Sequence, residues 1–405
     1  MSRLKEIPPT AGMPLQWSDF FSTDSDLEGG LANYFNNQTK IRLLSSGTAA
    51  LIVALSALKK LEPQKDEVII PAFTCPLVAI ACNQAGLKIR LCDFKKDSDQ
   101  LDPDFLKQSI NHKTLCVIPT HLGFYPQKMD EIMSIAREHN IFVVEDAAQA
   151  LGAKFEDTQA GLSGDIGIFS LTAGKGLTIF EGGTIACSNQ TILEKIDESI
   201  NELAQYNLFS ELILSLKLIA YMFLYNPTGL SIAYGAPLRA HLQKGDEIKA
   251  LDEEFKMPIP VRRVGYFRRL VGASALKRFD QFLNQKQTDA QKRMSQLKEL
   301  ESLDVFLVSE LNVSIKGCFA YVLLKSKKDL WQKRVLEKLW TSGLGVSKAF
   351  ACELSAYPYL KDIVPKTTCP NAEDFAKQTI SISNSHYLSD LEFIQIIESI
   401  KESSL

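Results

Sequence analysis

Short apolar runs alternate with helix-like segments between residues 40 and 200. The strand-like runs cover 41–47, 67–73, 89–94, 114–121, 141–149 and 167–171. Apolar residues at helical spacing lie between them, over 48–61, 75–86, 102–110 and 128–140. Strands rich in valine, isoleucine and leucine that alternate with helices predict a mostly parallel sheet with helices on both faces. Ligands bind such sheets at the carboxyl ends of the strands, so functional residues are expected there.

This alternation stops after residue 200, where residues 201–258 are predicted to form a helical hydrophobic insertion. Within it, residues 208–225 are one apolar run that ends before the sequence NPTGL. Glu211 and Lys217 inside the run count against a membrane span, because a charge at the centre of a bilayer is costly. We expect a helix buried in the core or in a dimer interface. The alternatives are peripheral contact with a membrane or lipid-like substrate, and a true span.

The remaining chain divides into a large domain over 1–200 that contains the predicted parallel sheet and, over 259–405, a connecting helix with a smaller C-terminal α+β domain. Residues 261–282 form a helix-like stretch with six arginines and lysines. This stretch predicts a solvated cationic face, or a face that meets the phosphates of a substrate. The smaller domain is indicated by a strand-like run and two helix-like segments, at 318–326, 333–343 and 388–402.

Composition is that of an ordinary soluble protein long enough for two domains, with 405 residues, 45% apolar and 23% charged. A net charge of −3 leaves no basic surface for nucleic acid. The eight cysteines form no CxxC pair or Cys/His cluster, so neither a metal site nor a disulfide framework is predicted. The first residues lack the apolar segment of a signal peptide. We therefore expect a cytoplasmic protein, with membrane association as the alternative raised by 208–225.

Candidate chemistry lies at three of the predicted strand ends. Ser46, Gly47 and Thr48 precede a helical run, where backbone N–H groups can hold a phosphate; the alternative is an ordinary helix cap at Ser46 or Thr48. Asp146 ends an apolar strand, where a buried carboxylate needs a cationic partner such as a protonated pyridine nitrogen. Its alternative role is again a helix cap.

The third strand end is the sequence FSLTAGKGLTIFEGG, residues 169–183. Ser170 can bind a phosphate, and Lys175 can form a Schiff base with an aldehyde if its pKa is lowered. The two glycines beside Lys175 are expected to leave room for a ligand ring. A phosphate cradle, a carboxylate and a lysine in this chain order predict a site for pyridoxal 5′-phosphate. The alternative for Lys175 is an ordinary surface lysine.

At these residues the chain resembles the DegT/DnrJ family of sugar aminotransferases, which are fold type I pyridoxal phosphate enzymes. The motifs that carry the resemblance are SSGTAAL, PAFTCPLVA, PTHLGFYPQKMDEI, VEDAAQALGA, GDIGIFSLTAGKG and EGGTIACSN. The resemblance implies that Lys175 forms the Schiff base and that Asp146 pairs with the pyridine nitrogen. It further implies that Gln149 approaches the ring hydroxyl and that Gly47, Thr48 and Ser170 hold the phosphate. Members are homodimers whose active sites take residues from the partner.

Several positions depart from the family pattern. Cys75 stands where many members have an aromatic residue that stacks on the cofactor, and Phe73 is the nearest aromatic replacement. In the family's GxNxR motif, whose asparagine reaches the partner's phosphate, Val261 replaces the asparagine and Arg263 matches the arginine. An arginine of this cluster, Arg263 first, is expected to replace the lost contact to a substrate or partner-subunit phosphate. The usual His-Tyr-Pro near the end reads SKAFACE.

The resulting hypothesis is an aminotransferase that moves an amino group from an amino acid to a keto sugar. By analogy with the family, the amino acid is expected to be glutamate and the keto sugar to be nucleotide-linked. One alternative acceptor is a lipid-linked or other hydrophobic carbonyl compound, suggested by the apolar run. A sugar dehydratase of the same family is disfavoured, because those members carry histidine at the position of Lys175. A non-catalytic cofactor-binding regulator is the alternative from another class.

Overall fold

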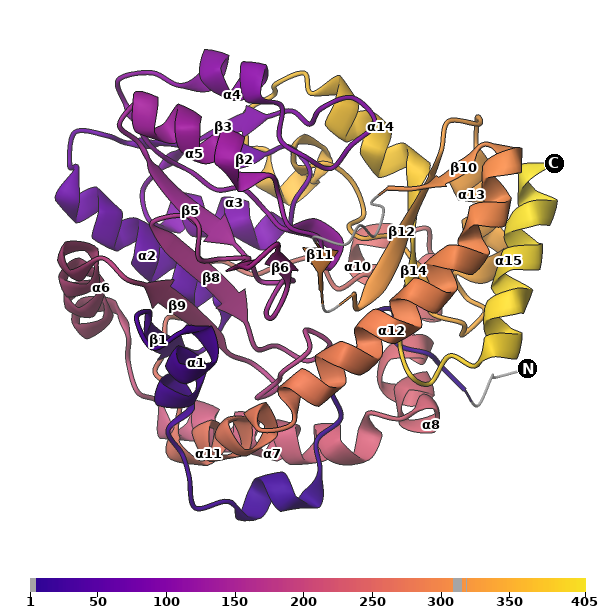
Figure 1. Cartoon of the computed structure of the whole chain (residues 1–405), viewed down its shortest axis with the longest axis horizontal. Helices are drawn as coiled ribbons and strands as arrows, with labels where there is room; N and C mark the ends of the chain where they lie inside the picture. The colour runs from indigo at the N-terminus through magenta and orange to yellow at the C-terminus, as the bar shows by residue number, and fades with distance from the viewer. Residues whose placement is uncertain (1–4, 309–314, 318) are drawn as a thin grey trace.

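A computed structural model describes residues 5–308, 315–317 and 319–405, and its largest element is a seven-stranded sheet (Figure 1). The strand order is β1-β9-β8-β5-β4-β2-β3. The strands are β1 (Lys40–Leu44), β2 (Glu67–Pro71), β3 (Lys88–Cys92), β4 (Thr114–Val117), β5 (Phe142–Asp146), β8 (Ile166–Ser170) and β9 (Gly183–Cys187). Only β9 runs antiparallel to its neighbours, and the other pairings among β8, β5, β4, β2 and β3 are parallel. The prediction of a mostly parallel sheet is confirmed.

Helices flank this sheet as the apolar periodicity predicts. They are α1 (Leu27–Phe35), α2 (Gly47–Leu61), α3 (Pro76–Gln84), α4 (Pro103–Ser109), α5 (Met129–Glu138) and α6 (Gln190–Leu203). Of these, α2 has nine buried residues, which places it in the core against the sheet. The strand of this sheet that the sequence pattern did not reveal is β9, whose sequence GTIAC contains only one valine, isoleucine or leucine.

The C-terminal part forms a second, antiparallel sheet in the order β10-β12-β14-β13. Its strands are β10 (Val305–Leu307), β12 (Tyr321–Ser326), β13 (Val346–Ser347) and β14 (Thr379–Ser383), and its helices are α13 (Trp331–Leu339), α14 (Pro370–Gln378) and α15 (Asp390–Ser404). The expected strand at 318–326 is β12, although Cys318 lies outside the described residues. Ile7 packs into the core of this sheet, and its N–H donates to the Gly343 carbonyl. The N-terminal segment therefore joins the two halves of the molecule.

Two short pairings and several single-turn helices complete the chain. A small sheet joins β6 (Lys154–Phe155) to β7 (Thr158–Gln159) and β11 (Ile315–Lys316). The single turns are η1 (Trp17–Phe21), η2 (Leu122–Phe124), η4 (Lys298–Leu303), η5 (Leu354–Ala356) and η6 (Pro358–Leu360).

The cationic stretch at 261–282 forms α11 (Tyr266–Leu276) and the start of α12 (Phe279–Leu297), which crosses diagonally to the C-terminal sheet (Figure 1). The prediction of a solvated cationic face holds for Arg263 and Lys277, which are exposed, but is wrong for Arg268. Arg268 is completely buried and forms a two-pronged ion pair with Glu211 at 2.7 and 2.8 Å. The neighbouring cations are also paired: Arg269 with Glu28, Lys277 with Asp24 and Arg278 with Asp19. These charges hold the surrounding elements together, since a buried guanidinium requires a partner.

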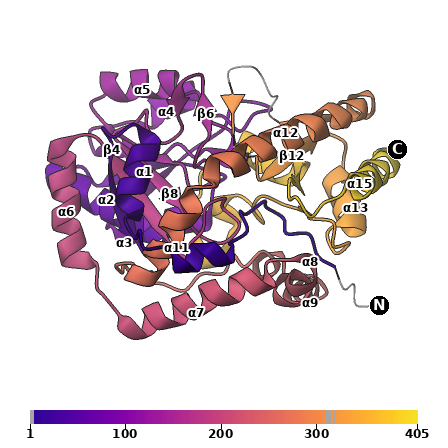
Figure 2. The ribbon, with the colours of Figure 1, turned by 60° about the horizontal axis from the view of Figure 1, so that its bottom comes forward.

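The insertion is helical, as predicted. It contains α7 (Leu208–Leu224), α8 (Pro227–Leu230), η3 (Ser231–Gly235), α9 (Ala236–Leu242) and α10 (Glu247–Ala250). Figure 2 shows α7 as a long helix along one side of the molecule, below α11. Only Leu214, Leu218 and Tyr221 of α7 are buried, so the expectation of a helix inside the core of the chain is wrong.

No single helix among the described residues has the length and apolarity to cross a membrane. Leu208–Leu224 and Pro227–Leu242 satisfy those criteria only as a pair, and the pair is bent by 117°.

Candidate active site

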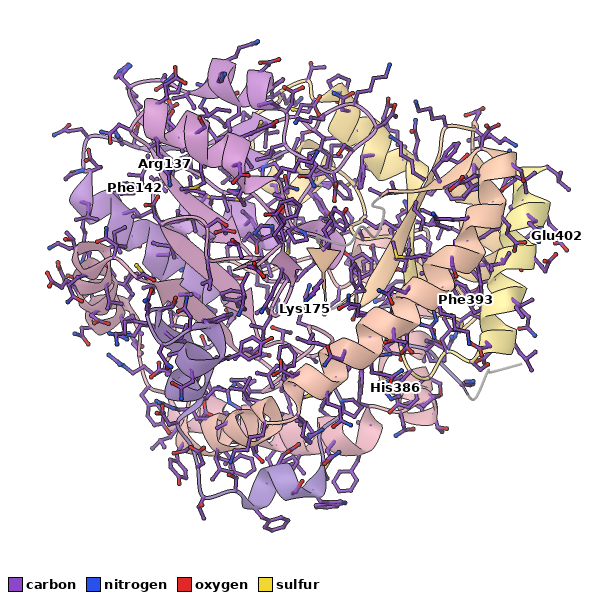
Figure 3. All side chains as sticks on the ribbon, viewed as in Figure 1. Arg137, Phe142, Lys175, His386, Phe393 and Glu402 are labelled. Carbon is purple, nitrogen blue, oxygen red and sulfur yellow. The ribbon has the colours of Figure 1, made fainter. Side chains whose placement is uncertain are left out.

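A cavity of about 410 Å³ lies where the two halves of the molecule meet. Its walls include the carboxyl ends of β5 and β8, the start of α2 and residues of β12 and β14. Figure 3 shows Lys175 near the centre of the molecule, between the large sheet and the C-terminal part. The structure brings eight predicted residues to this one cavity: Ser46, Gly47, Thr48, Cys75, Asp146, Gln149, Ser170 and Lys175.

The N-terminus of α2 forms one end of the cavity. Ser46 is the helix cap, and its hydroxyl accepts a hydrogen bond from the Ala49 N–H at 3.0 Å. Among the described residues, the N–H groups of Gly47 and Thr48 have no acceptor. Gly183 lets β9 pass close to this turn, because a Cβ there would lie 2.2 Å from the Gly47 nitrogen. Ser46 therefore caps the helix, while Gly47 and Thr48 line the cavity with N–H groups available to an anion, and their binding of a phosphate stays a prediction.

Asp146 is buried at the end of β5. Its Oδ1 accepts a hydrogen bond from the Ala148 N–H at 3.1 Å, but no helix follows, so the alternative role as a helix cap does not apply. Burial raises the pKa of the Asp146 carboxyl, and the Ala148 N–H and the charge of Lys175 oppose that rise. A cationic ligand group would lower the cost of this buried carboxylate.

Lys175 lies in a tight turn after β8. Burial lowers the pKa of its amine, whereas the carboxylates of Asp146 and Glu253 act in the opposite direction. Gly174 and Gly176 have φ angles of +83° and +81°, a backbone conformation that favours glycine. A Cβ on Gly174 would lie 2.6 Å from the Thr10 hydroxyl, so this glycine is required by the turn and its neighbour rather than by space for a ring.

Gln149 and Cys75, two further predicted residues, are both held in defined surroundings in the cavity wall. The Gln149 Oε1 accepts hydrogen bonds from the Tyr321 hydroxyl at 2.6 Å and from the Gly123 N–H at 3.1 Å. Cys75 precedes α3, and burial raises the pKa of its thiol to about 12, so it is neutral at physiological pH. Phe73 does not replace the missing aromatic residue, because it is packed among other phenylalanine rings and is 2% exposed.

Arg263 does not line the cavity of its own chain. Its guanidinium donates to the Asn201 side chain at 2.9 Å. The backbone of the preceding residue, Arg262, lies beside Ser45, which follows β1. The Ser45 N–H donates to the Arg262 carbonyl at 2.9 Å, and the Arg262 N–H donates to the Ser45 hydroxyl at 3.1 Å. A contact of Arg263 with a phosphate in the partner subunit remains a prediction.

Several cavity residues were not predicted from the sequence. Thr10 comes from the N-terminal segment, Tyr321 from β12, Lys348 from the C-terminal part and Glu253 from the insertion. The stretch around Lys348 was marked only by its departure from His-Tyr-Pro. Glu253 lies in a segment with no matching motif, so no sequence signal distinguished it from its acidic neighbours.

The residues present fit pyridoxal 5′-phosphate. The unpaired N–H groups of Gly47 and Thr48 match its phosphate, the buried Asp146 matches its ring nitrogen, and Lys175 matches its aldehyde. The cavity volume falls within the range of small-molecule sites, about 300–1,000 Å³. When bound, this cofactor supplies an electron sink for a carbanion.

Comparison with known proteins finds relatives whose names describe sugar-modifying enzymes. It is 32% identical to GDP-perosamine synthase of Escherichia coli O157:H7 over 166 residues, which cover 40% of this chain and 45% of that protein. It is 25% identical to GDP-4-keto-6-deoxy-D-mannose 3-dehydratase of Yersinia pseudotuberculosis, over 78% of this chain and 74% of that protein. The match to the synthase thus spans less than half of either chain.

The fold has a close counterpart among solved structures. The aminotransferase PseC of Helicobacter pylori, involved in pseudaminic acid biosynthesis, aligns with a TM-score of 0.73 over 98% of this chain and 99% of that one, at 16% identity. This similarity confirms the fold type I architecture. The model of the DegT/DnrJ/EryC1/StrS aminotransferase family matches residues 13–205 and 263–401, and it omits most of the insertion. The chain therefore belongs to the DegT/DnrJ/EryC1/StrS aminotransferase family.

Proposed function

We propose that this protein is a pyridoxal phosphate-dependent aminotransferase that transfers an amino group from glutamate to a nucleotide-linked keto sugar. The observation that carries the proposal is the convergence of Lys175, Asp146 and the free N–H groups of α2 on one cavity. Lys175 binds the cofactor aldehyde and later moves a proton between substrate and cofactor carbons. Asp146 holds the proton on the ring nitrogen, and Gly47 and Thr48 bind the phosphate together with Ser170.

A sugar acceptor is supported by the relatives. The names of the synthase and the dehydratase both refer to GDP-linked sugars, and the latter to a keto sugar. Amino transfer is favoured over dehydration because Lys175 stands at the position where the resemblance places histidine in the dehydratases. The lining of the cavity also includes apolar side chains such as Leu51, Val78 and Phe350, which suit the carbon faces of a sugar.

The first half-reaction tests this proposal directly. Addition of L-glutamate to the cofactor-loaded protein is expected to convert the bound cofactor to its amine form and to release one 2-oxoglutarate for each site. The conversion is followed by visible absorbance and the keto acid by a coupled assay. A screen of nucleotide-linked keto sugars against the amine form then identifies the acceptor. A protein that binds the cofactor but does not react with any amino acid would instead be a regulator.

We further propose that the chain is a homodimer assembled through the outer face of α7. Leu208, Phe209, Leu212 and Leu216 are each more than half exposed. Trp17 and Phe223, whose ring centroids lie 5.4 Å apart, are exposed near the other end of the helix. Several large exposed apolar side chains on one helix favour an interaction site. The insertion carries seven acidic and five basic residues, so it lacks the basic excess by which helices bind anionic membranes. A second copy is therefore the better occupant.

The double substitution Leu212→Glu and Leu216→Glu is expected to convert the dimer to a monomer, because it places two charges in the apolar interface. Light scattering after size-exclusion chromatography measures the mass. The matched control is Leu391→Glu, which introduces the same charge at a leucine that is 75% exposed on α15. A double variant that stays dimeric contradicts the proposal. Sedimentation of the wild type with anionic phospholipid vesicles, lost in the double variant, would assign the face to a membrane.

A further inference from the structure

Glu253 is a buried carboxylate that reaches the active-site cavity from the insertion. It is 6% exposed and follows Asp252, which ends the turn after α10 with a φ of +57°. The family model does not cover residues 206–262, so this side chain is an addition of this chain to the shared site. Its position in the same cavity as the reactive lysine therefore needs its own explanation.

The C-terminal part holds Glu253 from one side. The Oε2 accepts hydrogen bonds from the Ala351 N–H at 2.9 Å and from the Tyr357 hydroxyl at 2.6 Å. The Tyr359 hydroxyl donates to the Glu253 carbonyl, and Lys348 pairs with Glu247 of α10 at 2.6 Å. These contacts fix the end of the insertion and leave Oε1 without a hydrogen-bond donor among the described residues.

The charge of this carboxylate acts on the cavity. Burial raises the pKa of Glu253 to about 7, while the Tyr357 hydroxyl, the Ala351 N–H and the charges of Lys348 and Lys175 lower it. In turn, Glu253 raises the pKa of the Lys175 amine. The titratable groups whose charges interact with Glu253 are Lys175, Lys348, Cys75, Cys352, Tyr357 and Tyr359. Of these, Lys175 is the group at the centre of the proposed chemistry.

We propose that Glu253 is a positioning residue that holds positive charge on the Lys175 nitrogen, so that the insertion sets the protonation of the reactive group. The electrostatic reason is that an ionised carboxylate in a buried site favours a neighbouring cation. Asp146 acts on the same nitrogen, but in the assignment above its charge is matched by the cofactor ring. Glu253 is then the remaining carboxylate whose negative charge stabilises a positive charge on Lys175. This inference rests on the proposed role of Lys175 as the amine that binds the cofactor.

The test is a pH titration of the visible absorbance of the cofactor-loaded protein without substrate. In Glu253→Gln the midpoint of the Lys175–cofactor linkage is expected to move to lower pH, because the stabilising charge is lost. The matched control is Glu254→Gln, the adjacent residue, whose exposed carboxylate lies 3.7 Å from Lys249. The control is expected to titrate like the wild type. The two curves are expected to differ most between their midpoints, where the wild type is still protonated and Glu253→Gln is not.

A second variant tests the inference even if the Glu253→Gln protein does not fold. Tyr357→Phe keeps the ring but removes the hydroxyl that donates to Glu253, so the carboxyl becomes less acidic and the midpoint is expected to move in the same direction by a smaller amount. A Glu253→Gln protein that retains the cofactor and titrates like the wild type overturns the inference, as does an unchanged midpoint in Tyr357→Phe if Glu253→Gln does not fold. Absence of a Lys175-dependent absorbance band in the wild type overturns the proposed function itself.

Discussion

Replacement of Lys175 by alanine is expected to abolish both the visible absorbance of the cofactor linkage and turnover. The methyl group of alanine cannot bond to the aldehyde, and the cavity has no other lysine in the same turn. Loss of the proton-transfer role alone lowers the rate by about 10²- to 10⁴-fold, and loss of the covalent bond adds to this effect. Absorbance of the loaded protein and steady-state kinetics measure the two losses separately.

Lys348→Ala is the matched control for Lys175→Ala. Lys348 also lines the cavity, but its amine is paired with Glu247 at 2.6 Å. We expect it to leave the absorbance of the linkage in place. Retained turnover in Lys175→Ala, or loss of the absorbance band in Lys348→Ala instead, would contradict the assignment of Lys175 as the amine that binds the cofactor.

Asp146→Asn is the second substitution with a large expected effect. An amide of nearly the same shape keeps the hydrogen bond to the Ala148 N–H but removes the charge opposite the ring nitrogen. Loss of one partner from a buried ion pair costs about 3–5 kcal/mol, which corresponds to a rate reduction of about 10²- to 10³-fold or more. The cofactor should still bind, because Lys175 and the start of α2 are unchanged. Single-turnover kinetics with glutamate measure the effect.

Two control variants show whether the effect of Asp146→Asn comes from the loss of the carboxylate charge. Asp157→Asn changes an exposed aspartate in the turn between β6 and β7 and should leave the rate unchanged. Asp146→Glu keeps the charge and should be faster than Asp146→Asn, although the longer side chain is not an ideal fit. An Asp146→Asn protein as active as the wild type would show that this carboxylate does not control the ring nitrogen.

The large domain was predictable because its signals are local. Each strand and helix around the site has its own apolar period, and residues such as Ser46, Asp146 and Ser170 follow directly from their position at strand ends. Parallel topology then brings these ends to one edge of the sheet. The same reasoning missed β9, because its sequence GTIAC has a single large aliphatic residue and lacks the apolar run that marks the other strands.

The burial and ion-pair partners of the cationic stretch at 261–282 could not be predicted from the local sequence. Six positive residues in sequence suggested a solvated face or a phosphate site, but their fate depended on acids far away in the chain, such as Glu211 beside Arg268. Likewise, the apolar period of α7 predicted a helix but not which side faces the protein. Only packing decides that Leu214 and Leu218 are buried while Leu212 and Leu216 are exposed.

The amino-acid sequence determined the mostly parallel sheet through periodicity, and the order of Ser46, Asp146 and Lys175 at strand ends indicated the cofactor class. Cys75 and Gln149 were named only through the family resemblance. The tertiary structure alone decided which charges surround Lys175. Glu253, 78 residues further along the chain, is held in the same cavity by contacts with Ala351 and Tyr357 that no local pattern encodes. Electrostatic interactions depend on distance in space, and so the environment of the lysine emerges only when the insertion and the C-terminal part are folded against the sheet.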